Sequence, residues 1–227
     1  LNILKNKKLI KKNIQGEARA IRYDLLTNFC KKKKINIILT AHNLEDQVET
    51  FFIRLSRGSG LQGLSSMRQI NKIKGNINLV RPLLDLKKIQ LIKISKLIFN
   101  KYFKDPSNKN TKYLRTRIRN LKKTLEVSGI NYDKISQSIN NLASSRDTLE
   151  HYFNNTYKDL VSKKKGVTII DLEKFNKTKK EMQIMVLKKT IKEQSNSYYS
   201  VRSKKIDNLI NQIEAPKNSK STLGGCV

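Results

Sequence analysis

Apolar residues recur at intervals of three or four along much of the chain, and this spacing predicts amphipathic helices. The interval holds from Glu17 to Lys31 and again from Leu44 to Leu55, after which Gly58 can end the helix. It is longest over Tyr132–Leu160, where Arg146 lies within the apolar stripe and is assigned to packing rather than to catalysis. Shorter helices are expected over residues 89–103, 182–186 and 206–213.

Two short β-rich runs alternate with the first helices. Residues 35–41 read INIILTA and residues 77–80 read INLV, a composition typical of buried strands in a parallel sheet. The order helix, strand, helix, loop, strand predicts an α/β protein: part of an open, mostly parallel, Rossmann-like sheet, followed by a mainly α-helical region. A further extended piece is expected over residues 166–170.

Three parts are predicted from these patterns and from the distribution of charge. They are residues 1–104 as the remaining part of the α/β domain, residues 105–130 as a basic helical linking segment, and residues 131–227 as a mainly helical C-terminal domain.

The charge balance narrows the class of partner. Lys and Arg total 48 against 18 Asp and Glu, a formal net charge of 48 − 18 = +30. This surplus suits a polyanion such as nucleic acid better than a neutral metabolite. Lys, Asn and Ile are abundant throughout the chain, so part of the charge reflects its general composition. A nucleic-acid partner therefore needs support from specific residues.

Cysteine content and hydropathy favour a cytoplasmic protein. Cys30 and Cys226 are too few for a disulfide framework, which indicates a reducing compartment. No apolar run reaches the roughly 20 residues that a membrane span needs, so no membrane partner is expected.

Chemistry-bearing residues gather in the run TAHNLEDQVET at residues 40–50. His42 comes directly after a predicted strand, and ligands of open α/β sheets bind at such strand ends. Asp46 and Glu49 share a face of the following helix. Carboxylates beside a histidine can hold Mg²⁺ or bind an ammonium group. The structural alternative is that acidic residues near a helix start, such as Glu45, only complement its dipole.

Several motifs in this order resemble the tRNA(Ile)-lysidine synthetases, enzymes of the PP-loop ATP pyrophosphatase superfamily. The runs AHNLEDQVET at 41–50 and RLSRGSGLQGL at 54–64 are similar to the family pattern AHxxDDQxET followed by R..RG(S/A)G..GL. The other matches are NIQ at 13–15 with EARAIRY at 17–23, RPLL at 81–84, and DPSN at 105–108 with Tyr113, Arg115, Arg117 and Arg119.

The resemblance implies an ATP-dependent ligase. Such enzymes activate C2 of the wobble cytidine of tRNA(Ile), which has a CAU anticodon, as an adenylate. The amine of free lysine then displaces AMP and gives lysidine, which changes codon reading from AUG to AUA. ATP and Mg²⁺ are the implied cofactors, and the tRNA and L-lysine are the implied partners. The oligomeric state is left open, with a homodimer as one alternative.

The resemblance also assigns roles by position. Catalysis is expected from His42, Asp46 and Glu49, and nucleotide binding from His42, Glu45, Arg57 and Gly58. The expected lysine-binding residues are Arg19, Arg22, Asp46 and Glu49, and the expected tRNA-binding residues are Arg115, Arg117, Arg119 and Lys122. Glu45 and Asp46 are candidate Mg²⁺ ligands. Whether His42 accepts a proton from the amine or contacts ATP is open at this point.

Two departures from the family pattern affect these expectations. Glu45 stands where the family has Asp, which adds a methylene to a candidate metal ligand. The family's SGGxDS loop, which cradles the ATP phosphates, would lie upstream of Asn13, so we expect a fragment that cannot bind ATP properly. The alternatives are another tRNA-modifying PP-loop enzyme, such as a thiolase, and a non-catalytic tRNA-binding relic. The isolated cysteines count against a thiolase with an iron–sulfur cluster.

Overall fold

The structure is a computed structural model. It describes residues 14–73, 75–103, 111–164, 166–195, 201, 203–214 and 221–226. The chain forms two compact units: unit 1 comprises residues 1–54 and 66–137, and unit 2 comprises residues 55–65 and 138–227. The predicted division at residues 104 and 130 stays a prediction.

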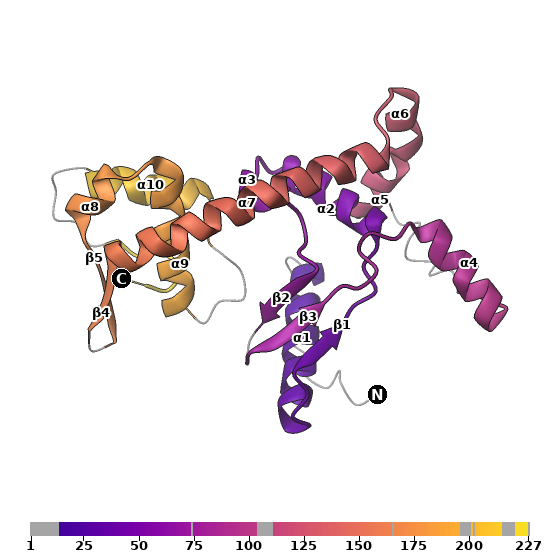
Figure 1. Cartoon of the computed structure of the whole chain (residues 1–227), viewed down its shortest axis with the longest axis horizontal. Helices are drawn as coiled ribbons and strands as arrows, with labels where there is room; N and C mark the ends of the chain where they lie inside the picture. Colours follow the sequence, from indigo (N-terminus) through magenta and orange to yellow (C-terminus); the bar gives the residue numbers. More distant parts are fainter. Residues whose placement is uncertain are drawn as a thin grey trace. The chain divides into compact units, whose positions relative to one another are not determined.

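Unit 1 is built on a three-stranded sheet with the order β1-β3-β2. One face is covered by α1, as Figure 1 shows, through a buried cluster of Tyr23, Cys30, Ile38, Ile77 and Leu79. The elements assigned to this unit are α1 (Ile14–Lys32), β1 (Ile37–Leu39), α2 (Leu44–Leu55), β2 (Ile70–Ile73), β3 (Ile77–Val80), α4 (Lys88–Phe99), α5 (Leu114–Asn120) and α6 (Lys122–Val127).

The expected sheet was mostly parallel, and this expectation needs correction because the sheet is mixed. Strands β1 and β3 are parallel, whereas β2 pairs with β3 in antiparallel fashion. The antiparallel pair is a tight hairpin in which Gly75 and Asn76 have φ of 81° and 59°. Strand β1 was expected to be buried, but only Ile38 is; Ile37 and Leu39 are 48% and 67% exposed.

Unit 2 is mainly helical. The predicted helix Tyr132–Leu160 is confirmed as α7, which contributes its first turns to unit 1 and the remainder to unit 2. The other elements of unit 2 are α3 (Leu61–Leu64), β4 (Val161–Lys164), β5 (Val167–Ile170), α8 (Leu172–Lys177), α9 (Lys180–Gln194) and α10 (Ser203–Glu214). Strands β4 and β5 form an antiparallel hairpin.

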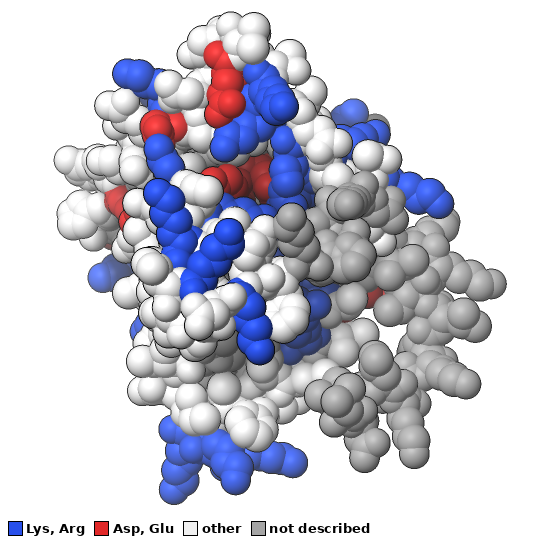
Figure 2. Space-filling view, turned by 90° about the vertical axis from the view of Figure 1, so that its right-hand side faces the viewer, with Lys and Arg blue, Asp and Glu red and all other residues white. Residues whose placement is uncertain are grey.

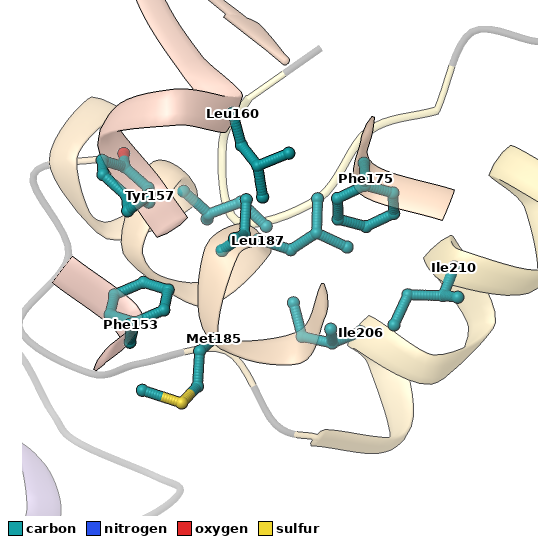
Figure 3. Packing of buried hydrophobic residues seen from close by; sticks show 10 residues of the cluster. Phe153, Tyr157, Leu160, Phe175, Met185, Leu187, Ile206 and Ile210 are labelled. Atoms are coloured by element: carbon teal, nitrogen blue, oxygen red, sulfur yellow. The ribbon is translucent and has the colours of Figure 1, made fainter. Parts of the chain in front are cut away.

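The core of unit 2 lies between α7, α8, α9 and α10 (Figure 3). Phe175, Val186 and Ile206 are fully buried there, and Phe153 and Leu160 of α7 pack against them. Burying a large apolar side chain of this kind stabilises a fold by about 1.5–3 kcal/mol. The cluster explains why these helices form despite the polar composition of the chain.

Arg146 illustrates how a charged side chain is accommodated in this unit. It is 5% exposed, its Nη1 donates to Ser65 Oγ at 2.9 Å, and its Nε lies 3.0 Å from Asp147 Oδ1. These contacts agree with its assignment to packing. Within the described ranges, no helix has the length and apolar character needed to cross a membrane.

Candidate functional site

The parallel pair of strands brings two sequence motifs to one edge of the sheet. The register continues past β1, where Thr40 N donates to Val80 O at 3.0 Å. His42 follows β1 and Arg81 follows β3, so both lie beyond the carboxyl ends of neighbouring parallel strands. This is the edge at which open α/β sheets bind ligands. We call His42, Arg81, Arg19 and Asp46 the rim site.

Electrostatic interactions connect the members of the rim site. Half-buried His42 has its pKa lowered from the ordinary value, mainly by burial. Asp46 acts in the opposite direction and raises that pKa, whereas Arg81, Arg19 and then Arg115 lower it. Arg19 comes from α1, where its guanidinium lies 5.3 Å from the centre of the Tyr23 ring. The rim site thus combines a neutral imidazole at pH 7 with guanidinium groups and a carboxylate.

A neutral His42 can accept a proton, and its ring is held in place. His42 Nδ1 lies 3.0 Å from Thr40 Oγ1. If Nδ1 bears the proton and donates to this hydroxyl, Nε2 is left as the acceptor. This arrangement meets the first requirement for a general base, which is to be deprotonated at the working pH.

Because its pKa is lowered, His42 is expected to titrate below pH 6.5, and its protonation should lower the stability of the fold. Because its pKa is lowered in the folded state, the unfolded chain takes up a proton first as the pH falls below 6.5. The contribution of His42 to stability is therefore present above pH 6.5. It is lost as the pH falls through the pKa that His42 has in the folded chain. NMR titration of the His42 ring measures this value. A pKa at or above 6.5 would contradict the described burial.

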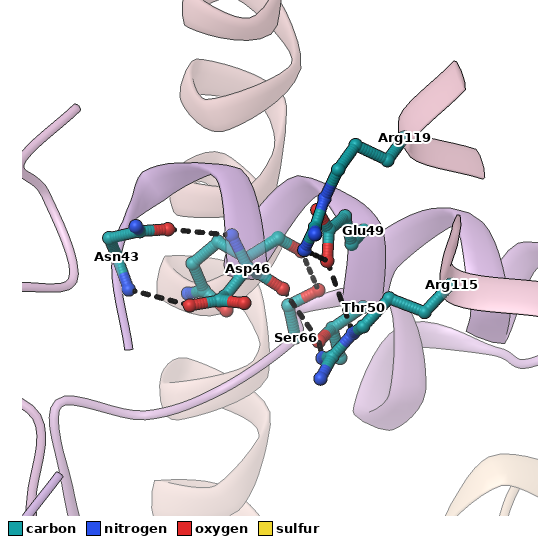
Figure 4. Close-up of polar contacts among 8 residues, drawn as sticks. Asn43, Asp46, Glu49, Thr50, Ser66, Arg115 and Arg119 are labelled. Atoms are coloured by element: carbon teal, nitrogen blue, oxygen red, sulfur yellow. Dashed lines mark hydrogen bonds and ion pairs between the residues drawn. The ribbon is translucent and has the colours of Figure 1, made fainter. Parts of the chain in front are cut away.

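Asp46 and Asn43 form a reciprocal cap at the start of α2 (Figure 4). Asn43 N donates to Asp46 Oδ2 at 3.1 Å, and Asp46 N donates to Asn43 Oδ1 at 3.0 Å. Each side chain satisfies an amide that the first turn of the helix leaves without a backbone partner. Asp46 is only half-buried, so the cap fixes its position and leaves it accessible from the rim site.

The side chain of Glu45 makes a hydrogen bond to the start of α4. Its Oε2 accepts from the backbone N of Lys88 at 2.8 Å, at the first residue of α4. Glu45 and Asp46 are therefore both engaged with backbone amides. Within the part of the chain that the structure describes, no group of three or more His, Cys, Asp or Glu residues is arranged to hold a metal ion.

Glu49 was expected to act in catalysis and to bind lysine together with Asp46, but its side chain is buried and only 1% exposed. Arg119 binds it through both oxygens, with Nε to Oε1 at 2.7 Å and Nη2 to Oε2 at 3.1 Å. Arg115 Nε lies 3.1 Å from Oε2, and its Nη2 donates to Thr50 Oγ1 at 3.3 Å. Figure 4 shows both arginines reaching from α5 to α2.

The ionisation of this buried group reflects two opposing effects. Burial is the larger one and raises the pKa of Glu49, while the hydrogen bond and charge of Arg119, and the charge of Arg115, lower it. On the partner, the hydrogen bond from Arg119 to Glu49 raises the pKa of Arg119. Burial affects the pKa of Glu49 more than that of Arg119, because the side chain of Glu49 is buried whereas that of Arg119 is 32% exposed.

The remaining predicted site residues lie on accessible surfaces. Arg22 is exposed on α1, and Arg117 is exposed on α5. Lys122 Nζ lies 5.0 Å from the centre of the Tyr132 ring and 3.8 Å from Glu126 Oε1. Figure 2 shows Lys and Arg side chains gathered around a small acidic area on one face of the molecule.

Two residues that were expected to bind nucleotide, Arg57 and Gly58, belong to unit 2. Arg57 and Gly58 are exposed, and Gly58 has a φ of 64°, a conformation that other residues rarely adopt. Its amide is already used, because Gly58 N donates to Leu55 O at 2.9 Å. The motif residues 105–108 and Asn13 lie outside the described residues.

Sequence reasoning missed three residues that support the site. Buried Gln47 clamps Met67, accepting from its N at 2.8 Å and donating to its O at 2.9 Å. Arg81 is 6% exposed, and its Nη1 donates to Arg68 O at 2.7 Å. The pKa of buried Tyr132 is raised to about 12, mainly by burial and then by Glu49. A parallel pairing of the two predicted strands would have pointed to Arg81.

The fold and the arrangement at the strand edge define an α/β protein of the PP-loop class. The family model described as PP-loop domain matches residues 2–125, more than half of the chain, and the chain belongs to this family. It is also a partial-length homologue of proteins named tRNA(Ile)-lysidine synthase.

Three relatives illustrate this homology. The tRNA(Ile)-lysidine synthase of Wolbachia pipientis wMel is 35% identical over 222 residues, which is 97% of this chain and 51% of the relative. That of Rickettsia akari (strain Hartford) is 33% identical over 220 residues, 95% of this chain and 50% of the relative. That of Orientia tsutsugamushi (strain Boryong) is 45% identical over 116 residues, 51% of this chain and 26% of the relative. The chain thus spans about half the length of the first two relatives.

Proposed function

We propose that the protein containing this chain ligates free lysine to C2 of the wobble cytidine of tRNA(Ile), using ATP. The observation that carries this proposal is the rim site, in which a neutral imidazole, a carboxylate and guanidinium groups meet at the ligand-binding edge of a PP-loop sheet. Homology to tRNA(Ile)-lysidine synthases along nearly the whole chain supports it. The net charge of +30 suits the RNA substrate.

The proposed reaction balances through two displacements. The C2 oxygen of cytidine attacks the α-phosphorus of ATP and releases diphosphate. The lysine amine then forms a bond to C2, and AMP leaves with the oxygen. The amine loses a proton in this step, and His42 is the residue proposed to accept it. The residues proposed for nucleotide binding are His42, Glu45, Arg57 and Gly58.

The two ends of lysine are assigned to opposite charges. Asp46, and Glu49 behind it, attract the ammonium group, and Arg19 with Arg22 attracts the carboxylate. Arg19 is the better supported of the two arginines, because it acts on the pKa of His42 and so lies within electrostatic reach of the rim site. Arg22 is exposed one turn further along α1.

Residues of α5 and α6 are proposed to contact the tRNA backbone. Replacing Arg115 and Arg117 with alanine should weaken tRNA binding and reduce the slope of log affinity against log salt by about 2, because each lost phosphate contact removes about 1. Filter binding over a salt series measures both quantities. The matched control is Lys158→Ala with Lys204→Ala, which removes the same charge from exposed positions of unit 2. An equal change in the two double variants would refute a specific contact.

The experiment that tests the function is ATP-dependent transfer of radiolabelled lysine to RNA. It uses protein expressed from the complete reading frame around these residues and a tRNA(Ile) transcript with a CAU anticodon. Label is expected in this transcript and not in one with a UAU anticodon, which lacks the wobble cytidine. Equal labelling of both, or of neither, would refute the proposal.

A further inference from the structure

Side chains of α2 hold the segment 66–69, which leads into β2. Gln47 is 7% exposed and uses both ends of its amide, because Oε1 accepts from Met67 N at 2.8 Å and Nε2 donates to Met67 O at 2.9 Å. Further along α2, Arg54 Nη1 donates to Ser66 O at 3.0 Å. Ser66 has a φ of 54°, which residues other than glycine adopt only where surrounding contacts impose it. The backbone path of the segment is therefore set by α2.

The same segment holds Arg81 on its other side. The Nη1 of Arg81 donates to Arg68 O at 2.7 Å, and its backbone N donates to Gln69 O at 2.8 Å. Arg81 is only 6% exposed. The position of its guanidinium thus depends on the carbonyl of Arg68, which directly follows the residue that Gln47 binds.

Arg81 is in turn a neighbour of His42. The hydrogen bond from Thr40 N to Val80 O extends the parallel pairing, so the chain segments that carry His42 and Arg81 leave the sheet next to each other. A fixed positive charge disfavours the imidazolium form. Among the guanidinium groups that lower the pKa of His42, Arg81 has the largest effect. The charged groups that act on this imidazole are Asp46 from α2, Arg81 after β3, Arg19 from α1 and Arg115 from α5.

We propose that Gln47 is a positioning residue, which fixes the guanidinium of Arg81 beside His42 and so keeps this imidazole able to accept a proton. Gln47 acts at a distance, because both ends of its amide are bound to Met67. The hydrogen bonds of the segment 66–69 carry the effect to Arg81. This inference rests on the proposed function, in which His42 takes a proton from the lysine amine, and adds a residue that serves this step.

The test is NMR titration of labelled His42 in protein expressed from the complete reading frame. Gln47→Met removes both hydrogen bonds to Met67 at nearly constant volume and adds no charge. The released segment should let Arg81 move away from the imidazole, so the pKa of His42 should rise towards 6.5. The acid limb of the pH profile of kcat/KM for lysine transfer should move to higher pH by the same amount.

A matched control and a double variant separate positioning from a general loss of stability. Gln183 is also buried, in unit 2, where its Nε2 donates to Phe175 O at 3.2 Å. Gln183→Met should lower stability and leave the pKa of His42 unchanged. Arg81→Gln should raise that pKa, and adding Gln47→Met should raise it no further, because the two residues act in series. Gln47→Asn and Arg81→Lys replace any variant that does not fold.

Three outcomes overturn the proposal. They are an unchanged pKa of His42 in folded Gln47→Met, an equal rise in Gln183→Met, and additive rises in the double variant. The ring titration needs no lysine transfer, so its result is independent of the proposed reaction. A protein in which the pKa of His42 responds as expected, but which transfers no lysine to the tRNA, would refute the proposed function alone.

Discussion

Replacing Glu49 with alanine is expected to lower the free energy of unfolding by about 3 kcal/mol. This is the lower end of the cost of breaking a buried ion pair, and the partial exposure of both arginines justifies the lower value. The substitution removes the acceptor of three short contacts between α2 and α5 and leaves two guanidinium groups without their carboxylate. Urea unfolding followed by far-ultraviolet circular dichroism measures the loss.

Two comparison variants separate charge from hydrogen bonding. Because burial raises the pKa of Glu49 above 4.5, its contribution to stability is fully present below that pH and declines as the pH rises through the folded pKa. Glu49→Gln removes this pH dependence and keeps one acceptor, so it should cost only about 1 kcal/mol at pH 7. Glu126→Ala removes an exposed ion pair of 3.8 Å with Lys122 and should change stability by no more than about 0.5 kcal/mol. A loss in Glu49→Ala as small as that of Glu126→Ala would contradict the described pairing.

Replacing Asp46 with asparagine is expected to lower kcat/KM for lysine about 10- to 100-fold. A hydrogen bond to a charged group contributes about 1.5–3 kcal/mol, and asparagine cannot supply the negative charge that attracts an ammonium group. The helix cap should survive, because asparagine keeps an oxygen that can accept from Asn43 N. Steady-state transfer of labelled lysine to the tRNA transcript at varied lysine concentration measures the effect.

Asp171 provides the matched control for Asp46. It caps α8, where its Oδ1 accepts from Lys174 N at 3.1 Å, and it belongs to unit 2. Asp171→Asn makes the same chemical change at a helix cap outside the rim site, so kcat/KM for lysine should be unchanged. Equal losses in the two variants would show that Asp46 acts through the fold and not through its charge.

The helices were predictable because their signal is local. The spacing of apolar residues over Tyr132–Leu160 predicted a helix with the observed bounds, and Leu44–Leu55 was also recovered. Strands β2 and β4 were missed because INKI and VSKK have no apolar face of their own. Each becomes a strand only by pairing with β3 or β5, and this antiparallel pairing is what makes the first sheet mixed.

The candidate site was predictable in its position and less so in its contacts. His42 at a strand end and Asp46 at a helix start follow from the order of elements along the chain. The pairing of Glu49 with Arg119 joins residues 70 positions apart, and no local pattern distinguishes that arginine from one that faces RNA. The basic run that includes Arg115 was read as a surface for phosphate, whereas part of it also neutralises a buried carboxylate.

The most direct test of the proposed reaction is the mass of the nucleosides released from the tRNA after incubation with ATP and lysine. If a lysine amine displaces the C2 oxygen at the strand-edge site, the wobble nucleoside should become heavier by one lysine less one water, and Asp46→Asn should form this product about 10- to 100-fold more slowly at low lysine concentration. An unmodified wobble cytidine after incubation with the complete protein, or sulfur in place of lysine, would contradict the account.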